Sequence, residues 1–377
     1  MKIKGLAINI GVAVAAFAML FIVTEVILRL YAGIVFVYKK ASFSPQTNAD
    51  VCGFNQFQKQ VSGIFQPSNN PDLGVELKPG AVIDSGLSGI RGELWLKVNQ
   101  RGLREDREYA IPKPPDVVRI AVLGDSVAFG WGQDLAASYS KILERKLQSF
   151  TAQSGSNKKI EVLNFGVPGY NGKQKIIVFK DKVLPYQPDL VIMSWLIDDT
   201  GHPAYLLGLP LIPNSVTKFL NGHSYLFSCF RERVLKKVYE LNARPYKEQY
   251  QEDSEGWNES KKMFKEISGV SKRGGVPVLM VMLPVWQSFD KNTADGIASI
   301  HEFLDKTAKE NGLDYADILP YLKNVTTIPD YVAAKGDLYH PNYNGHEMIA
   351  DAIYTKITGE KPPPDPIFPL SPFLFKK

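Results

Sequence analysis

The sequence has little cysteine, little histidine and only one long uncharged run. Two cysteines, Cys52 and Cys229, occur in 377 residues, so a disulfide-dense scaffold is excluded. The sequence leaves open whether these two pair or remain separate thiols. With 45% hydrophobic and 22% charged residues, the composition is that of an ordinary folded protein, which excludes disordered and collagen-like chains.

Positive charge is also scarce in the body of the chain. The formal net charge is +5, but residues 1–40 hold five basic side chains and one acidic side chain. The remaining residues therefore carry a net charge of only +1. A basic groove for phosphates has little support, and we expect no nucleic-acid partner.

The single long uncharged run is Gly5–Thr24, 20 residues without Asp, Glu, Lys or Arg. As a helix it would span about 30 Å, the thickness of a hydrocarbon core. Apolar character resumes after Glu25 and Arg29, so we expect a single-pass N-terminal anchor that contacts the lipid bilayer through residues 5–37. A cleaved signal peptide and a buried helix are the alternatives. A short N-terminal tail usually stays inside, which would make the C-terminal portion extracytoplasmic, either periplasmic or on the outer face.

The pattern along the chain predicts four parts: an anchor in 1–40, a lead-in module with short strands in 41–116, a large α/β domain in 117–358 and a Pro-rich tail in 359–377. Within 117–358, apolar strands alternate with amphipathic helices, which predicts a three-layer α/β/α fold around a central five-stranded parallel sheet. Strands are expected near 117–123, 160–165, 189–195, 276–283 and 313–318, and helices near 137–147, 173–184, 258–272, 295–311 and 344–358.

Residues 202–257 interrupt this alternation. Their first half is apolar and their second half is charged. One interpretation is a cap inserted over a binding site. The other is a segment that packs against the lead-in module or the membrane surface.

A serine follows the first strand of the α/β domain, in the sequence Gly124-Asp125-Ser126. Glycine allows a sharp turn at the end of a strand, and backbone N–H groups at the start of the next segment stabilise developing negative charge. A nucleophile would suit this position, although the motif alone is weak.

Asp337 and His340 lie three residues apart near the other end of the domain. A serine hydroxyl needs a base to accept its proton, and an imidazole needs a carboxylate to fix its tautomer. One short loop would supply both groups. A structural histidine is the competing interpretation.

Two further loops follow the second and third strands, at 164–169 and 196–199. Gly169 in the first could present its backbone N–H to an oxyanion. Because the carboxyl ends of parallel strands meet at one edge of a sheet, we expect these loops to lie beside Ser126. Their coincidence favours a serine hydrolase more than any single motif does.

These ordered blocks resemble the SGNH (GDSL-type) hydrolase superfamily over about residues 117–358. The lead-in segments 72–79 and 98–104 resemble membrane-anchored bacterial members. The resemblance implies a flavodoxin-like SGNH fold, Ser126 as nucleophile, His340 as general base and then acid, and Asp337 as the residue that orients His340. It also implies an oxyanion hole built from the N–H groups of Ser126 and Gly169, with no metal and no organic cofactor.

The sequence departs from that family at Asp198, where Asn is expected. The Asn side chain donates to the oxyanion, whereas an ionised carboxylate has no donor and would repel it. Three outcomes remain open: Asp198 is protonated and donates, it points elsewhere, or catalysis has decayed.

The leading functional hypothesis is a membrane-anchored serine esterase that removes an ester-linked acyl group, most simply O-acetyl, from a cell-envelope glycan. Its substrate would be an acylated carbohydrate or another small ester. An O-acyltransferase with the same triad, served by a membrane-bound acyltransfer partner, is the second hypothesis. A non-catalytic module that binds glycan or a partner on the same fold is the third.

Overall fold

The computed structural model describes part of the 377-residue chain. Two units are distinguished: residues 1–59 with 207–243, and residues 60–206 with 244–377. The described residues are 12, 15–16, 19–27, 62–89, 92–200, 224, 250–286, 291–324, 330–333 and 339–365. Both cysteines, most of the predicted anchor and most of the predicted cap in 202–257 fall outside these ranges.

Apart from Ser224, the described residues of the first unit are helical and lie between positions 12 and 27. Their large apolar side chains are exposed, and the set comprises Val12, Met19, Leu20, Phe21, Ile22, Val23, Val26 and Ile27. Within the described ranges, no helix has both the length and the apolar character that a membrane crossing requires.

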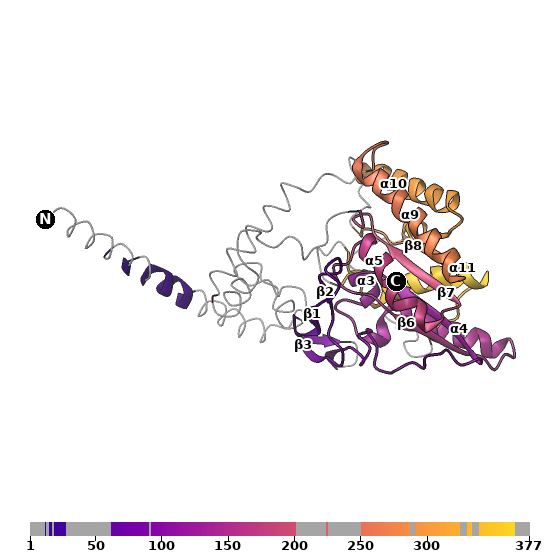
Figure 1. Ribbon diagram of the computed structural model, residues 1–377, viewed down its shortest axis with the longest axis horizontal. Helices are drawn as coiled ribbons and strands as arrows, with labels where there is room; N and C mark the ends of the chain where they lie inside the picture. The colour runs from indigo at the N-terminus through magenta and orange to yellow at the C-terminus, as the bar shows by residue number, and fades with distance from the viewer. Residues whose placement is uncertain are drawn as a thin grey trace, which may run out of the picture. The chain divides into compact units, whose positions relative to one another are not determined.

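The second unit contains the predicted five-stranded parallel sheet, in the order β6-β5-β7-β8-β9. Figure 1 labels β6, β7 and β8 of this sheet. Its strands are β5 (Val117–Leu123), β6 (Lys159–Asn164), β7 (Leu190–Trp195), β8 (Val278–Met282) and β9 (Asp314–Asp317). Every residue of β8 is buried, as expected for a strand covered on both faces. The first strand, β5, pairs with both β6 and β7. The strand order reverses at β5, and ligands of such sheets bind beyond the carboxyl ends of the strands at this point.

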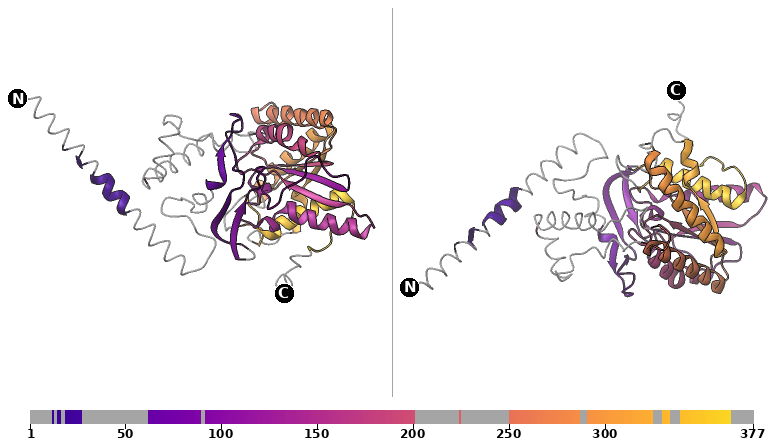
Figure 2. Two further views of the ribbon diagram at one scale, coloured as in Figure 1. Left: turned by 60° about the horizontal axis from the view of Figure 1, so that its bottom comes forward. Right: turned by 90° about the horizontal axis from the view of Figure 1, so that it is seen from above.

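Helices cover both faces of the sheet, which confirms the three-layer α/β/α prediction. On one face α4 (Tyr139–Gln153) contacts β6 and α11 (Tyr343–Thr358). On the other face α9 (Glu255–Gly274) contacts β8, α5 (Gly172–Val178) and α10 (Lys291–Glu310) (Figure 2). The helix predicted near 137–147 is confirmed as α4, whose Ile142, Leu143 and Leu147 side chains are buried in the core.

Short helical segments complete this unit. They are η1 (Ser62–Ile64), α3 (Ser126–Phe129), η2 (Leu135–Ala137), η3 (Phe179–Val183), η4 (Leu184–Tyr186) and η6 (Leu319–Asn324). The segment η3 is a π-helical turn that continues α5.

The described part of the lead-in segment forms two antiparallel strand pairs. They are β1 (Phe65–Pro67) with β2 (Val75–Leu77), and β3 (Val82–Gly89) with β4 (Gly92–Lys97). In β4 the buried Leu94 and Leu96 alternate with the exposed Trp95, the period-2 pattern of a strand with one covered face. Hydrogen bonds tie this segment to the α/β layers, because Gln174 of α5 donates to the Leu73 carbonyl oxygen at 2.9 Å.

Candidate active site

Ser126 lies at the carboxyl edge of the sheet, where β5 turns into α3. Asp125 caps this short helix, and its Oδ1 accepts a hydrogen bond from the Val127 N–H at 2.8 Å. Gly124 is required at the turn because a Cβ there would lie 2.1 Å from Oγ of Ser194. Gly130 ends the helix with φ of 79°. The serine is thus held at the start of a helix by a tightly packed turn.

His340 is held by backbone pairing on one side and by a helix on the other. Its carbonyl oxygen accepts a hydrogen bond from the Ala333 N–H at 2.9 Å, and Val332 forms a bridge with Pro341. Asn342 then caps α11 by accepting from the Gly345 N–H at 3.2 Å. The short segment that carries the imidazole is therefore held on both sides.

These two side chains meet although 214 positions separate them in the sequence. Nε2 of His340 lies 2.9 Å from Oγ of Ser126, within hydrogen-bond distance. Both residues are partly buried, and the His340 ring has Trp131 as an aromatic neighbour at 6.3 Å between centroids. A serine hydroxyl beside an imidazole is the arrangement that nucleophilic acyl transfer needs.

Asp337, predicted to orient His340, falls outside the described residues. Its role therefore stays a prediction.

The backbone N–H groups of Ser126 and Gly169 were predicted to face an oxyanion. Gly169 follows β6 and has φ of 83°, a conformation that glycine adopts readily. Over the described ranges, neither N–H has a hydrogen-bond acceptor in the protein. Both donors are therefore available to a ligand.

The loop between Asn164 and Gly169 is packed against the helix that begins at Ser126. The Asn164 side chain donates to the Ala128 carbonyl oxygen at 2.7 Å and accepts from the Gly166 N–H at 2.9 Å. A Cβ on Gly166 would lie 2.3 Å from the backbone nitrogen of Phe129. This close backbone approach fixes the loop beside Ser126.

Asp198 follows β7 and remains exposed at the surface, although protein atoms crowd around its carboxyl group. This desolvation and the nearby Asp125 carboxylate raise the pKa of Asp198 to about 6, while Lys175 and His340 act in the opposite direction. Asp198 immediately precedes Asp199, which binds the same Lys175 ammonium as Asp125, the residue before Ser126. Above pH 6 the carboxyl is mainly ionised and offers no donor.

The sequence did not identify the buried charges that support these loops. Lys175 of α5 binds Asp125 and Asp199, and Glu105 of the lead-in segment binds the Asn164 N–H. Neither Lys175 nor Glu105 belongs to a motif that predicts burial. Only their partners, which lie far away in the sequence, reveal that they are buried.

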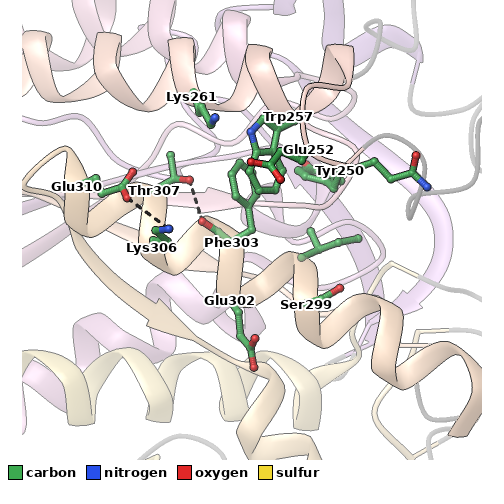
Figure 3. Close-up of a pocket in the computed structure, with 12 residues that line it drawn as sticks. Tyr250, Glu252, Trp257, Lys261, Ser299, Glu302, Phe303, Lys306, Thr307 and Glu310 are labelled. Atoms are coloured by element: carbon green, nitrogen blue, oxygen red, sulfur yellow. Dashed lines mark hydrogen bonds and ion pairs between the residues drawn. The ribbon is translucent and has the colours of Figure 1, made fainter.

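Two further features bear on ligands. In the described part of the chain, no three His, Cys, Asp or Glu side chains come together as they would around a metal ion. A cavity of about 560 Å³ lies along α9 and α10, where the Trp257 ring stacks on Phe303 at 3.6 Å between centroids (Figure 3). Neither Ser126 nor His340 lines it, so this cavity is separate from the candidate active site.

Comparison with known proteins decides the family. The sequence profile described as GDSL-like Lipase/Acylhydrolase family matches residues 122–348, which include Ser126 and His340. The chain belongs to this family. The match confirms the predicted superfamily and the predicted enzyme class, a GDSL-type serine ester hydrolase.

Individual proteins are similar to this chain at low sequence identity. An acetylxylan esterase of Xylanibacter ruminicola is 24% identical over 294 residues, which is 73% of this chain and 51% of that protein. This chain thus aligns with about half the length of that relative. An acetyl xylan esterase structure from Geobacillus stearothermophilus is 14% identical, with a TM-score of 0.42 over 65% of this chain and 98% of that one. An alpha/beta hydrolase enzyme from the Lake Arreo metagenome is 17% identical, with a TM-score of 0.41 over 64% and 95%.

Proposed function

We propose that this protein is a carbohydrate acyl esterase that cleaves ester-linked acyl groups, most simply O-acetyl, through Ser126 and His340. The 2.9 Å contact between Oγ of Ser126 and Nε2 of His340 is the observation that carries the proposal. Family membership supplies the reaction class. The acetylxylan esterase relative supports an acetylated glycan as the substrate class.

The reaction starts when Oγ of Ser126 attacks the ester carbonyl carbon and Nε2 of His340 accepts the hydroxyl proton. The carbonyl oxygen becomes an oxyanion, for which the N–H groups of Ser126 and Gly169 are the proposed donors. When the ester C–O bond breaks, His340 gives its proton to the departing sugar oxygen, which leaves as a hydroxyl. Water, deprotonated by His340, then attacks the acyl carbon. The bond from this carbon to Oγ of Ser126 breaks, Oγ takes the proton back from His340, and the carboxylic acid is released. Asp337 is the proposed orienting carboxylate.

We also propose that an N-terminal membrane anchor holds the esterase domain outside the cytoplasm. This location would limit the substrates to esters that reach the membrane surface. The uncharged run of residues 5–24 supports it, together with the exposed apolar side chains described between positions 12 and 27. Substrates would then be acetylated glycans of the cell envelope. Protease accessibility of the domain in intact cells and in lysed cells tests this topology.

The activity is tested with the full chain purified in detergent, using a chromogenic acetyl ester and an acetylated xylo-oligosaccharide. The native chain is expected to release acetate from both. Ser126→Ala should abolish this release, and Asp337→Asn should lower kcat on the order of 10³-fold or more if Asp337 fixes the histidine tautomer. Equal rates for the native chain and Ser126→Ala across several acyl esters would contradict the proposal. Acetate transfer to an added glycan in preference to water would indicate a transferase instead.

A further inference from the structure

Lys175 is a buried lysine whose ammonium contacts three segments around the active site. Its side chain is 1% exposed. Nζ lies 3.0 Å from Oδ2 of Asp125 and 3.0 Å from the carbonyl oxygen of Ser194. It also lies 2.7 and 2.6 Å from the two carboxylate oxygens of Asp199. All three ammonium hydrogens therefore have acceptors, each from a different segment at the sheet edge.

Each carboxylate bound by Lys175 in turn holds the backbone of a loop in the site. Asp125 immediately precedes Ser126 and accepts from the Val127 N–H at 2.8 Å. Asp199 immediately follows Asp198 and accepts from the Leu196 N–H at 2.7 Å. The ammonium thus joins the turn that carries the serine to the loop that carries Asp198.

The opposite charges of Lys175 and its two carboxylate partners stabilise this arrangement. Burial lowers the pKa of the Lys175 ammonium, but Asp125 and Asp199 outweigh that effect and raise the pKa overall. The lysine is therefore charged at neutral pH. An ammonium without carboxylate partners would be costly in this position, so the three groups act as one unit.

We propose that Lys175 is a positioning residue for ester hydrolysis, which fixes the distance between the Ser126 turn and the Asp198 loop. The assignment rests on the proposed function, because a positioning role is defined by the reaction that it serves. A misplacement of about 1 Å in such a site can lower the rate on the order of 100-fold.

Lys146 provides a matched control within the same chain. Its side chain is also 1% exposed, and its ammonium also binds two carboxylates and one carbonyl oxygen: Glu347 at 3.3 Å, Asp351 at 2.6 Å and Pro363 at 2.9 Å. These partners belong to α11 and the segment after it. If both lysines only balance buried charge, substitution of Lys175 and of Lys146 should have the same effect on kcat.

The test compares Lys175→Met and Lys146→Met in the full chain with a chromogenic acetyl ester. Active sites are counted by stoichiometric labelling with a fluorophosphonate, so that kcat refers to correctly folded protein. Lys175→Met is expected to lower kcat per labelled site at least about tenfold, with KM changed less than about threefold. Lys146→Met is expected to lower the melting temperature while kcat per site stays native.

A charge-balanced variant covers the case in which Lys175→Met fails to fold. Lys175→Met with Asp199→Asn removes one ammonium and one carboxylate, and the amide oxygen introduced in this way can still accept from the Leu196 N–H. Its melting temperature should recover while kcat per site stays low. A native kcat per site in either Lys175 variant, or equal kcat losses in the Lys175 and Lys146 variants, would overturn the assignment. Absence of turnover in the native chain would instead overturn the proposed function.

Discussion

Glu105 accepts a hydrogen bond at 2.9 Å from the backbone N–H of Asn164, which lies 59 positions further along the chain. The same carboxylate forms an ion pair with Lys141 at 2.7 Å, and the Lys141 ammonium also binds the Val162 carbonyl oxygen at 2.6 Å. Asn164 ends β6, just before the loop that carries Gly169. The lead-in segment is therefore part of the support of the active site.

Glu105→Ala should destabilise the fold strongly. It leaves the buried Asn164 N–H without its acceptor and takes from Lys141 its closest carboxylate. We expect the free energy of unfolding to fall by about 3 kcal/mol, as for other broken buried ion pairs. Glu266→Ala, which breaks an exposed pair with Lys180, should cost less than about 1 kcal/mol. Urea denaturation followed by tryptophan fluorescence measures both, and equal losses would show that Glu105 has no special role.

Gly166→Ala should reduce activity because the added methyl group would displace the helix that begins at Ser126. Its Cβ would lie 2.3 Å from the backbone nitrogen of Phe129, and backbone atoms cannot rotate away. We expect kcat to fall on the order of 100-fold. Gly269→Ala in α9 is the control, since its Cβ would meet only the mobile end of Arg273 at 3.1 Å. A Gly166→Ala enzyme with native kcat would contradict the packing argument.

Asp198→Asn should increase activity, and the gain should depend on pH. The pKa of Asp198 is raised to about 6, so the native carboxyl loses its proton as the pH rises through 6 and then repels the oxyanion. Asn keeps an N–H donor at every pH. We expect the ratio of kcat/KM between variant and native enzyme to grow from pH 5 to pH 8 and to reach roughly 100-fold.

Taking this ratio cancels the pH dependence of the groups that both enzymes share. A ratio that does not change between pH 5 and pH 8 would mean that Asp198 does not face the oxyanion.

The sequence predicted the sheet and its helices because each depends on a local pattern, whereas the pairing of Ser126 with His340 was implied by the resemblance to the SGNH superfamily. Apolar strands and short turn motifs are visible within a few residues, and parallel topology brings the strand ends together. The roles of Lys175 and Glu105 could not be predicted in this way. Lys175 lies in an amphipathic helix and Glu105 in a polar segment, and the burial of each depends on partners more than 20 positions away.

The ionisation of Asp198 was left open for a related reason. Its pKa depends on how closely Asp125, Lys175 and the surrounding protein atoms approach its carboxyl group. Sequence spacing does not supply these distances, so the raised pKa of Asp198 could be derived only from the structure.

His346 is fully buried at the start of α11, and we expect it to lower the stability of the protein at low pH. Its Nδ1 accepts from the Tyr139 N–H at 3.3 Å, so the ring is neutral with the proton on Nε2. Over the described part of the chain, Nε2 has no hydrogen-bond partner. Burial, with a smaller effect of His340, lowers the pKa of His346 from 6.5 to about 3.

Between pH 6.5 and pH 3 the unfolded chain therefore binds a proton at His346 that the folded protein excludes, and stability falls as the pH falls through this window. At pH 5 the expected loss is about 2 kcal/mol relative to pH 7. His346→Asn keeps an acceptor for the Tyr139 N–H but cannot gain a proton. Its free energy of unfolding should therefore fall about 2 kcal/mol less than that of the native protein between pH 7 and pH 5. Identical pH dependence of the two proteins in urea denaturation would show that His346 is not held neutral.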